Sequence, residues 1–252
     1  MQNNAKGWPM KFSRACELLL LLICLISFSV TGCVTVSVNT DSANQSGIPP
    51  GCELDPNTGQ VFCADACEKT YEHTVTVAMH QNLEEFNSDV VYRILEEAQN
   101  AAQKAEGVFS NGNVECQVSF KMVSGGMNEI TEEEMDDTVD TEEEYISLMQ
   151  RPEWVKVVNS LYICAINGQM VNNYPSHFSG CGTDYPYKLS IVEYDDQYPA
   201  TYHGPLWLHE IGHTRGNIHK PWEQGDSWVM YPAPTENSRK LTCRECARYL
   251  LP

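Results

Sequence analysis

The order of apolar and polar residues along the chain predicts strands and helices in alternation. Residues 74–80 alternate apolar with polar side chains, as a half-buried strand does, and residues 83–105 repeat apolar positions at helical spacing. The apolar side of that helix carries Phe86, Val90, Ile94 and Ala98. The later stretches typical of strands are residues 114–123, 155–166 and 189–192. Within the second of them, residues 161–166 (LYICAI) are apolar enough to predict the centre of the sheet. We therefore expect an α/β (α+β) domain.

A second helix is predicted to begin at Pro205 and to end at Gly216. Proline is tolerated in the first turn of a helix, where its missing N–H would have no intrahelical partner. Glycine after the last turn adopts the left-handed conformation that ends many helices. Between these two residues, Trp207 and Leu208 are expected to lie in the core.

Residues 1–32 have the parts of an export signal. Lys6, Lys11 and Arg14 form a basic start, and the apolar residues 18–30 are too few to span a bilayer. The sequence VTGC that follows resembles a bacterial lipobox, whose cysteine is diacylated and becomes the new N-terminus. We expect Cys33 to carry lipid; ordinary cleavage nearby, which would leave Cys33 as a thiol, is the alternative.

The rest of the chain divides by composition into three parts. Residues 33–51 are small and polar, end in Pro-Pro-Gly, and read as a lipidated N-terminus with a flexible tether. Residues 52–72 form a cysteine-rich segment that leads into the domain, and residues 73–252 form the domain itself. The resulting protein would be exported and lipid-anchored in the cell envelope, at the outer membrane or cell surface if the organism is Gram-negative.

The cysteine count supports an exported protein. Eight cysteines remain if the signal is removed and Cys33 is lipidated. They are Cys52, Cys63, Cys67, Cys116, Cys164, Cys181, Cys243 and Cys246. An even number in an exported chain predicts up to four disulfides, but it leaves their pairing open.

The charge of the chain excludes some partners. The formal net charge is −18; the signal removes three basic residues and one acidic residue, which leaves 13 basic and 33 acidic residues and a net charge of −20. Such a surface repels nucleic acid and anionic lipid headgroups, so we expect no nucleic-acid binding and attachment to a membrane through the lipid alone. We expect a monomer.

Ten of the acidic residues fall within residues 129–144. A calcium-binding EF-hand loop would need spaced Asp or Asn and a central glycine, which this stretch lacks. A solvated acidic loop with a short helix is the better interpretation.

Residues 206–219 (LWLHEIGHTRGNIH) hold the strongest candidate chemistry. Residues four apart on a helix differ by about 40° around its axis, so His209 and His213 lie on one face and can bind one zinc ion. Glu210 lies about 100° from His209, too far to be a ligand but able to reach a water on the metal. Gly216 allows a sharp turn, after which His219 can return as third ligand. Three protein ligands leave one position open, which is typical of catalytic zinc.

This pattern, HExxHxxGxxH over residues 209–219, resembles the signature of metzincin zinc peptidases. The sequence VMYP at residues 229–232 is similar to the Met-turn of that family. The resemblance implies that Met230 forms an apolar floor beneath the three histidines and is not a ligand.

The resemblance also implies a fold and a substrate site. It predicts a twisted mixed sheet with an antiparallel edge strand, a backing helix, the active-site helix and a small C-terminal subdomain. Residues 179–182 (SGCG) lie where the edge strand would fall, and in the family the substrate pairs with that strand. Cys243-x-x-Cys246 is similar to half of the second zinc site of archaemetzincins. The other cysteine pair, expected between His219 and Met230, is absent, so disulfides are favoured.

These features lead to one main hypothesis and two rivals. The main one is a lipid-anchored zinc endopeptidase that acts on protein or peptide substrates, with Glu210 as the base that deprotonates a zinc-bound water. The first rival is a non-catalytic binding or adhesion module on the same scaffold, which would have no need of Glu210. The second is an amidase acting on peptidoglycan peptides, which the sequence does not separate from a peptidase.

Overall fold

The fold of the predicted domain is described by a computed structural model. It describes residues 52–54, 61–63, 69–103, 107–109, 112–114, 116–166, 168–183 and 189–250. All of them belong to one unit, Gly47–Pro252. The predicted signal, Cys33 with its lipid, and the predicted tether lie outside the described residues. In the part of the chain that is described, no helix has the length and apolar character needed to cross a bilayer.

A five-stranded sheet forms the framework. Its strands lie in the order β12-β13-β8-β3-β6. Their bounds are Gly180–Gly182 for β12, Ser190–Glu193 for β13, Val155–Val158 for β8, Tyr71–His80 for β3 and Val118–Ile130 for β6. The neighbours β13–β8, β8–β3 and β3–β6 are parallel, and β12 pairs antiparallel with β13. The mixed sheet with an antiparallel edge strand at residues 180–182 is thus confirmed.

The strand at the centre of the sheet differs from the prediction. It is β8 (VKVV), all four residues of which are buried, whereas the apolar run at residues 161–166 lies outside the sheet. Part of that run forms β10 (Ile163–Ile166), which makes a separate antiparallel hairpin with β11 (Gln169–Asn172). The prediction was wrong because Lys156 interrupts the apolar pattern of β8. The side chain of Lys156 is nevertheless fully buried, and its ammonium donates to the carbonyl of Glu153.

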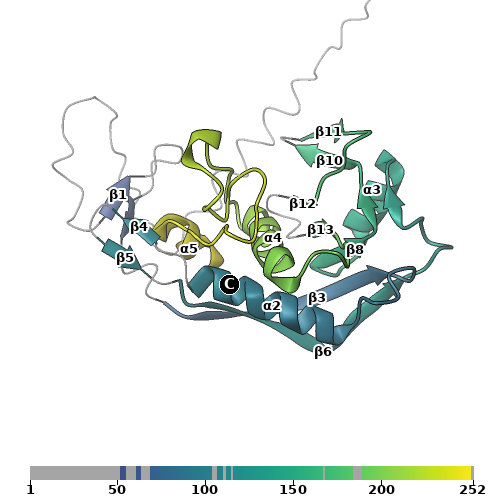
Figure 1. The fold of residues 1–252 in the computed structure, drawn as a ribbon, viewed down its shortest axis with the longest axis horizontal. Coiled ribbons are helices and arrows are strands. Elements are labelled where there is room, and N and C mark those ends of the chain that lie inside the picture. The colour runs from purple at the N-terminus through teal and green to yellow at the C-terminus, as the bar shows by residue number, and fades with distance from the viewer. Residues whose placement is uncertain are drawn as a thin grey trace, which may run out of the picture. The chain divides into compact units, whose positions relative to one another are not determined.

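Two long helices cover the sheet. Helix α2 (Ser88–Gln103) begins where the Asn87 side chain accepts hydrogen bonds from the N–H groups of Asp89 and Val90. Helix α4 (Ala200–Thr214) packs beside it, and Figure 1 shows α2 running along β3 and β6 with α4 next to it. Helix α2 is shorter than the predicted residues 83–105, so Phe86 is buried but precedes it. The other predicted apolar residues, Val90, Ile94 and Ala98, are buried on α2, as are Trp207 and Leu208 on α4. These residues form one core with β3, β6 and β8.

The remaining elements are short. They are β1 (Cys52–Leu54), β2 (Val61–Cys63), β4 (Gly107–Phe109), β5 (Gly112–Val114), β7 (Thr138–Val139), α3 (Glu142–Gln150), β9 (Ser160–Leu161), η2 (Trp222–Gln224) and α5 (Cys243–Tyr249). Strands β7 and β9 pair in parallel and form a separate two-stranded sheet. Leu161, the first residue of the apolar run, belongs to that sheet. A second apolar cluster gathers Tyr145 and Leu148 of α3 with Cys164 and Cys181.

Helix α4 begins earlier than predicted. Its first residue is Ala200, which follows Pro199 at the N-cap, and Pro205 therefore lies inside the helix. A proline at the sixth helical position removes one backbone hydrogen bond, because only the first four N–H groups of a helix lack an intrahelical partner. The predicted end of the helix is confirmed: Gly216 follows it with φ of +78°, in the left-handed region.

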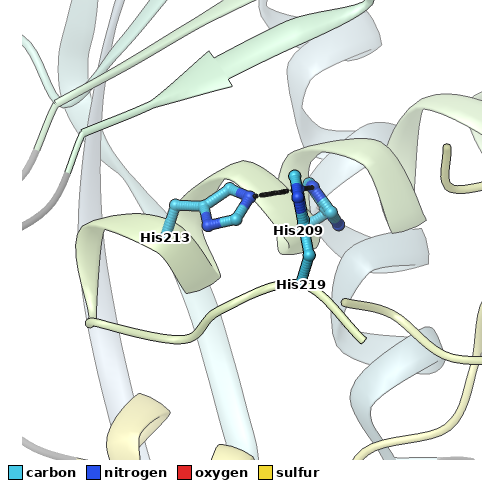
Figure 2. Close-up of side chains that lie close together, drawn as sticks. All are labelled: His209, His213 and His219. Atoms are coloured by element: carbon cyan, nitrogen blue, oxygen red, sulfur yellow. Dashed lines mark hydrogen bonds between the residues drawn. The ribbon is translucent and has the colours of Figure 1, made fainter. Parts of the chain in front are cut away.

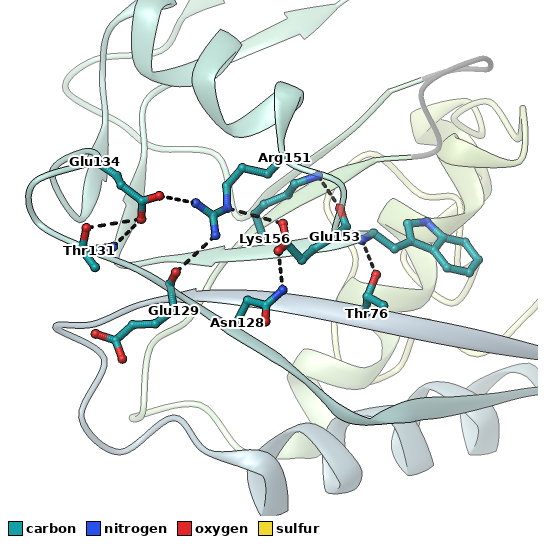
Figure 3. A network of polar contacts seen from close by, with 9 residues as sticks. Thr76, Asn128, Glu129, Thr131, Glu134, Arg151, Glu153 and Lys156 are labelled. Atoms are coloured by element: carbon teal, nitrogen blue, oxygen red, sulfur yellow. Dashed lines mark hydrogen bonds and ion pairs between the residues drawn. The ribbon is translucent and has the colours of Figure 1, made fainter.

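The acidic stretch at residues 129–144 is partly held in place by its neighbours. Arg151 pairs with Glu134 at 2.9 Å and with Glu153 at 3.4 Å, and its guanidinium also donates to the carbonyl of Glu129 (Figure 3). Asn128 donates to Glu153 at 2.6 Å, which joins the end of β6 to the segment before β8. The short helix that we expected is α3, but residues 138–139 form a strand where a loop was predicted.

Three disulfides join cysteines that the structure describes. They are Cys52–Cys63, Cys116–Cys246 and Cys164–Cys181, and Cys243 is disulfide-bonded as well. The preference for disulfides over a second zinc site at Cys243 and Cys246 is therefore confirmed, because a disulfide sulfur is not a thiolate ligand. Several disulfides are typical of extracellular proteins.

This pairing predicts the number of free thiols. The purified domain should yield no more than one or two alkylatable thiols before reduction, and eight after complete reduction in denaturant. Mass spectrometry after alkylation measures both numbers. Four or more thiols before reduction would contradict the disulfides and reopen the possibility of thiolate metal ligands.

Candidate metal centre

Helix α4 and the loop after it bring three histidines together. His209 and His213 project from the same face of α4, one turn apart, and His219 returns to them from the loop (Figure 2). The three Nε2 atoms lie 2.9 to 3.2 Å from one another. In the described part of the chain, they form the one group of three or more His, Cys, Asp or Glu residues with ligand atoms this close together. The predicted histidine set therefore converges on a single point.

Backbone carbonyls set the direction of two of these rings. His209 Nδ1 lies 2.6 Å from the carbonyl of Val229, and His213 Nδ1 lies 2.9 Å from the carbonyl of Asn217. A carbonyl can only accept, so each Nδ1 carries the proton and each Nε2 keeps its lone pair. Lone pairs that face one another repel unless a cation lies between them.

The distances between these nitrogens fit a zinc ion. Zinc–nitrogen bonds of about 2.0–2.1 Å in a tetrahedron place the ligand nitrogens about 3.3 Å apart. The spacing of 2.9 to 3.2 Å is slightly shorter and needs only a small outward shift of the rings. The three-histidine group can thus hold a metal ion such as zinc.

The loop after α4 is fixed by polar contacts with the C-terminal region. The left-handed Gly216 reverses the chain, and the backbone N–H of Lys220 then donates to the carbonyl of Met230 at 2.7 Å. The ammonium of Lys220 pairs with buried Glu245 of α5 at 3.0 Å. These contacts are made by the residue directly after His219, and they keep that histidine close to α4.

Burial keeps the histidines neutral. It lowers the pKa of His209 well below its usual value and lowers that of His213 to about 4, with the nearby histidines as a second cause. Burial also lowers the pKa of His219. A metal ion binds only the neutral form of imidazole, so at neutral pH no proton has to leave these rings before metal can bind.

Glu210 lies between α4 and the edge strand β12. Desolvation raises the pKa of its carboxyl to about 8, although the backbone N–H of Gly182 donates to it and lowers the pKa. A Cβ at Gly180 would lie 2.6 Å from Glu210 Cγ, and one at Gly182 would lie 2.7 Å from His213 Cβ. Larger residues do not fit at these two positions. Glu210 Oε2 is buried and has no hydrogen-bond partner among the described residues.

Met230, the residue of the Met-turn hypothesis, lies in the core beside α4. It is fully buried, and its sulfur lies 3.7 Å from the hydroxyl of Tyr249. That hydroxyl donates to the carbonyl of Leu208 in α4 at 2.7 Å. Val229, which directly precedes Met230, supplies the carbonyl that orients His209. Met230 thus packs beside the helix that carries the histidines and is not among the grouped ligands.

Two other histidines near the site in sequence lie apart from the group. His177 pairs with Glu193 at 2.6 Å, and His203 Nε2 donates to the carbonyl of Asp195 at 3.0 Å. The residues that sequence reasoning missed act through a backbone carbonyl or a side-chain hydroxyl. They are Val229 and Asn217 as acceptors and Tyr249 as a brace. Val229 and Asn217 lie inside the quoted stretches at residues 229–232 and 206–219, whereas Tyr249 lies outside both.

Comparisons with known proteins add little to this geometry. No family model matches the chain, and no curated protein matches it. One similar solved structure is metalloproteinase-II from Bacteroides fragilis, with 12% sequence identity and a TM-score of 0.37. The similarity covers 72% of this chain and 53% of that one, so the chain spans about half the length of that structure. The class of this protein therefore follows from its own structure: it has a mixed α/β fold and a three-histidine group able to hold a metal ion.

Proton release on metal binding follows from the raised pKa of Glu210. In the metal-free protein a carboxyl with a pKa of about 8 is protonated at pH 7, and a cation nearby favours its charged form. Zinc binding at pH 7 should therefore release about one proton more from the wild type than from Glu210→Gln. The difference should shrink above pH 9. Calorimetry in buffers of different ionisation enthalpy measures it, and equal release from both proteins at pH 7 would contradict it.

Proposed function

We propose that this protein is a lipid-anchored zinc endopeptidase of the metzincin type. The observation that carries the proposal is the convergence of His209, His213 and His219 with Glu210 directly beside them. A three-nitrogen site leaves one coordination position for a reactant, and a hydrolase needs a carboxyl near such a site to take a proton. A zinc site that only stabilised the fold would be closed by a fourth protein ligand.

The residues divide the chemistry between them. When bound, zinc supplies a Lewis acid that activates water and polarises the substrate carbonyl. Glu210 takes the proton of the attacking water and passes it to the leaving amine, which is general base and then general acid catalysis. The rings of His209 and His213 are held by the carbonyls of Val229 and Asn217, so they need not reorganise during the reaction.

The free edge of strand β12 is an argument for a peptide as the substrate. It is the outermost strand of the sheet, and among the described residues it pairs with β13 alone. An extended peptide can hydrogen-bond to such a free edge and lie across the site, because Gly180 and Gly182 already touch Glu210. This arrangement favours an endopeptidase over a binding module, which would gain nothing from a buried carboxyl beside the metal.

Cleavage of a mixed peptide library tests the proposal. The zinc-loaded protein should cut peptides at internal bonds, and a hydroxamate chelator should stop it. Peptidoglycan fragments tested in parallel separate the amidase alternative. If the zinc-loaded protein cuts nothing in the library, it is not a peptidase; if it cuts only the peptidoglycan fragments, it is an amidase.

Attachment to the envelope is proposed to depend on Cys33. Replacing Cys33 by Ser removes the thiol that receives the lipid, so the precursor should keep its signal and gain no acyl mass. Mass spectrometry of the protein from membrane fractions measures this. A wild-type mature N-terminus at another residue, without lipid, would contradict the anchor and leave the peptidase proposal unaffected.

A further inference from the structure

We propose that the Cys164–Cys181 disulfide positions Glu210 by holding strand β12 against helix α4. The proposal rests on the proposed role of Glu210 as the base of the reaction. It assigns a functional role to a disulfide on the side of β12 opposite to its two glycines.

The two faces of β12 have different neighbours. Successive residues of a strand point to opposite sides, so Gly180 and Gly182 share one side and Cys181 takes the other. The glycine side lies directly on α4: a Cβ at Gly180 would be 2.7 Å from Glu210 Cδ, and a Cβ at Gly182 would be 3.1 Å from Glu210 Oε2. The position of β12 therefore decides where the Glu210 carboxyl can lie.

Cys181 fixes the other side of the strand. It is 2% exposed, and its sulfur lies 3.6 Å from the hydroxyl of Tyr145 in α3. Its disulfide partner, Cys164, is 6% exposed and belongs to β10 of the β10–β11 hairpin. The disulfide thus connects the strand beside Glu210 to a second apolar cluster on the side away from α4.

Backbone pairing alone gives β12 little support. The strand has three residues, and its three partners all lie in β13. Strands this short at the edge of a sheet open readily, because few hydrogen bonds hold them. The disulfide supplies a covalent constraint at the middle residue of the strand. Without it, β12 would move away from α4 and the Glu210 carboxyl would lose its two glycine neighbours, Gly180 and Gly182.

A double-mutant cycle tests the proposal in the zinc-loaded protein. Cys164→Ala/Cys181→Ala removes the disulfide, and Cys52→Ala/Cys63→Ala is the matched control, because the two disulfides close loops of similar length, 17 and 11 residues. Loss of Cys164–Cys181 should lower kcat by about 10-fold to 100-fold, as expected for a displaced catalytic group. Zinc content should stay unchanged. In a Glu210→Gln background, loss of the Cys164–Cys181 disulfide should change kcat by less than about twofold, because the carboxyl that the disulfide positions is already gone.

Hydrogen exchange provides a readout that does not depend on activity. The Gly182 amide should exchange faster in Cys164→Ala/Cys181→Ala than in the wild type, and at an unchanged rate in the control. If Gly182 stays equally protected, or if kcat falls by the same factor in both backgrounds, the disulfide is only structural and the proposal is wrong. If the wild type cuts no peptide at all, the proposed function fails, and exchange at Gly182 still decides whether the disulfide holds β12 on Glu210.

Graded reduction covers the case in which the alanine pair does not fold. A dithiol reductant gives two electrons and two protons to the disulfide, forms two cysteine thiols, and closes to its own cyclic disulfide. Alkylation and mass spectrometry measure the fraction of each disulfide that is reduced. Activity should fall in proportion to reduction of Cys164–Cys181; a fall that instead follows Cys52–Cys63 or Cys116–Cys246 would overturn the proposal.

Discussion

Replacing His213 by alanine is expected to abolish zinc binding and peptide cleavage together. His213 Nε2 lies 3.0 Å from that of His209 and 2.9 Å from that of His219, so its removal leaves two nitrogens and an open side. Mutations that affect only the hydrogen-bond partners of metal ligands cost 10-fold to 100-fold in affinity, so loss of a ligand should cost more than about 100-fold. Elemental analysis after dialysis and the rate of peptide cleavage measure the two effects.

A matched control separates this effect from a general loss of histidine. His177 has a side chain that is 51% exposed and lies outside the three-histidine group. His177→Ala should keep one zinc per chain. Retention of zinc by His213→Ala, or equal loss of zinc from His177→Ala, would contradict the assignment of the ligands.

Replacing Glu210 by glutamine is expected to separate metal binding from catalysis. The amide keeps the size of the side chain, and the three nitrogens are untouched, so zinc should remain near one per chain. The amide cannot take a proton at neutral pH, and loss of general base catalysis costs about 10²–10⁴ in rate. Steady-state kinetics should show the loss in kcat with a smaller change in KM, because Glu210 acts on the proton and not on the bound peptide.

The metal group could be predicted from the sequence because it depends mainly on local geometry. Helical periodicity alone places His209 and His213 on one face, and the left-handed Gly216 lets the chain turn so that His219 can return to them. The edge strand at residues 180–182 was placed only through a resemblance to known peptidases. Its two glycines could have been read as a sign of close packing, since alternate glycines in a strand leave room on one side.

Other features depend on contacts between distant residues and could not be predicted. The carbonyls of Val229 and Asn217 orient two ligands, but a backbone carbonyl has no signal in the sequence. The disulfide pairing joins Cys116 to Cys246 across 130 residues, which composition does not reveal. The central strand was misplaced because Lys156 is buried, an arrangement that a hydropathy pattern treats as exposed.

A zinc titration with cleavage followed at each step tests the central claim most directly. Metal-free wild type should cut no peptide, gain activity in proportion to added zinc, and reach its full rate at one zinc per chain. Glu210→Gln should bind zinc along the same curve while its rate stays at least about 100-fold lower throughout. A wild type that is fully active without zinc, or a Glu210→Gln variant whose rate rises with that of the wild type, would contradict a zinc peptidase built on His209, His213, His219 and Glu210.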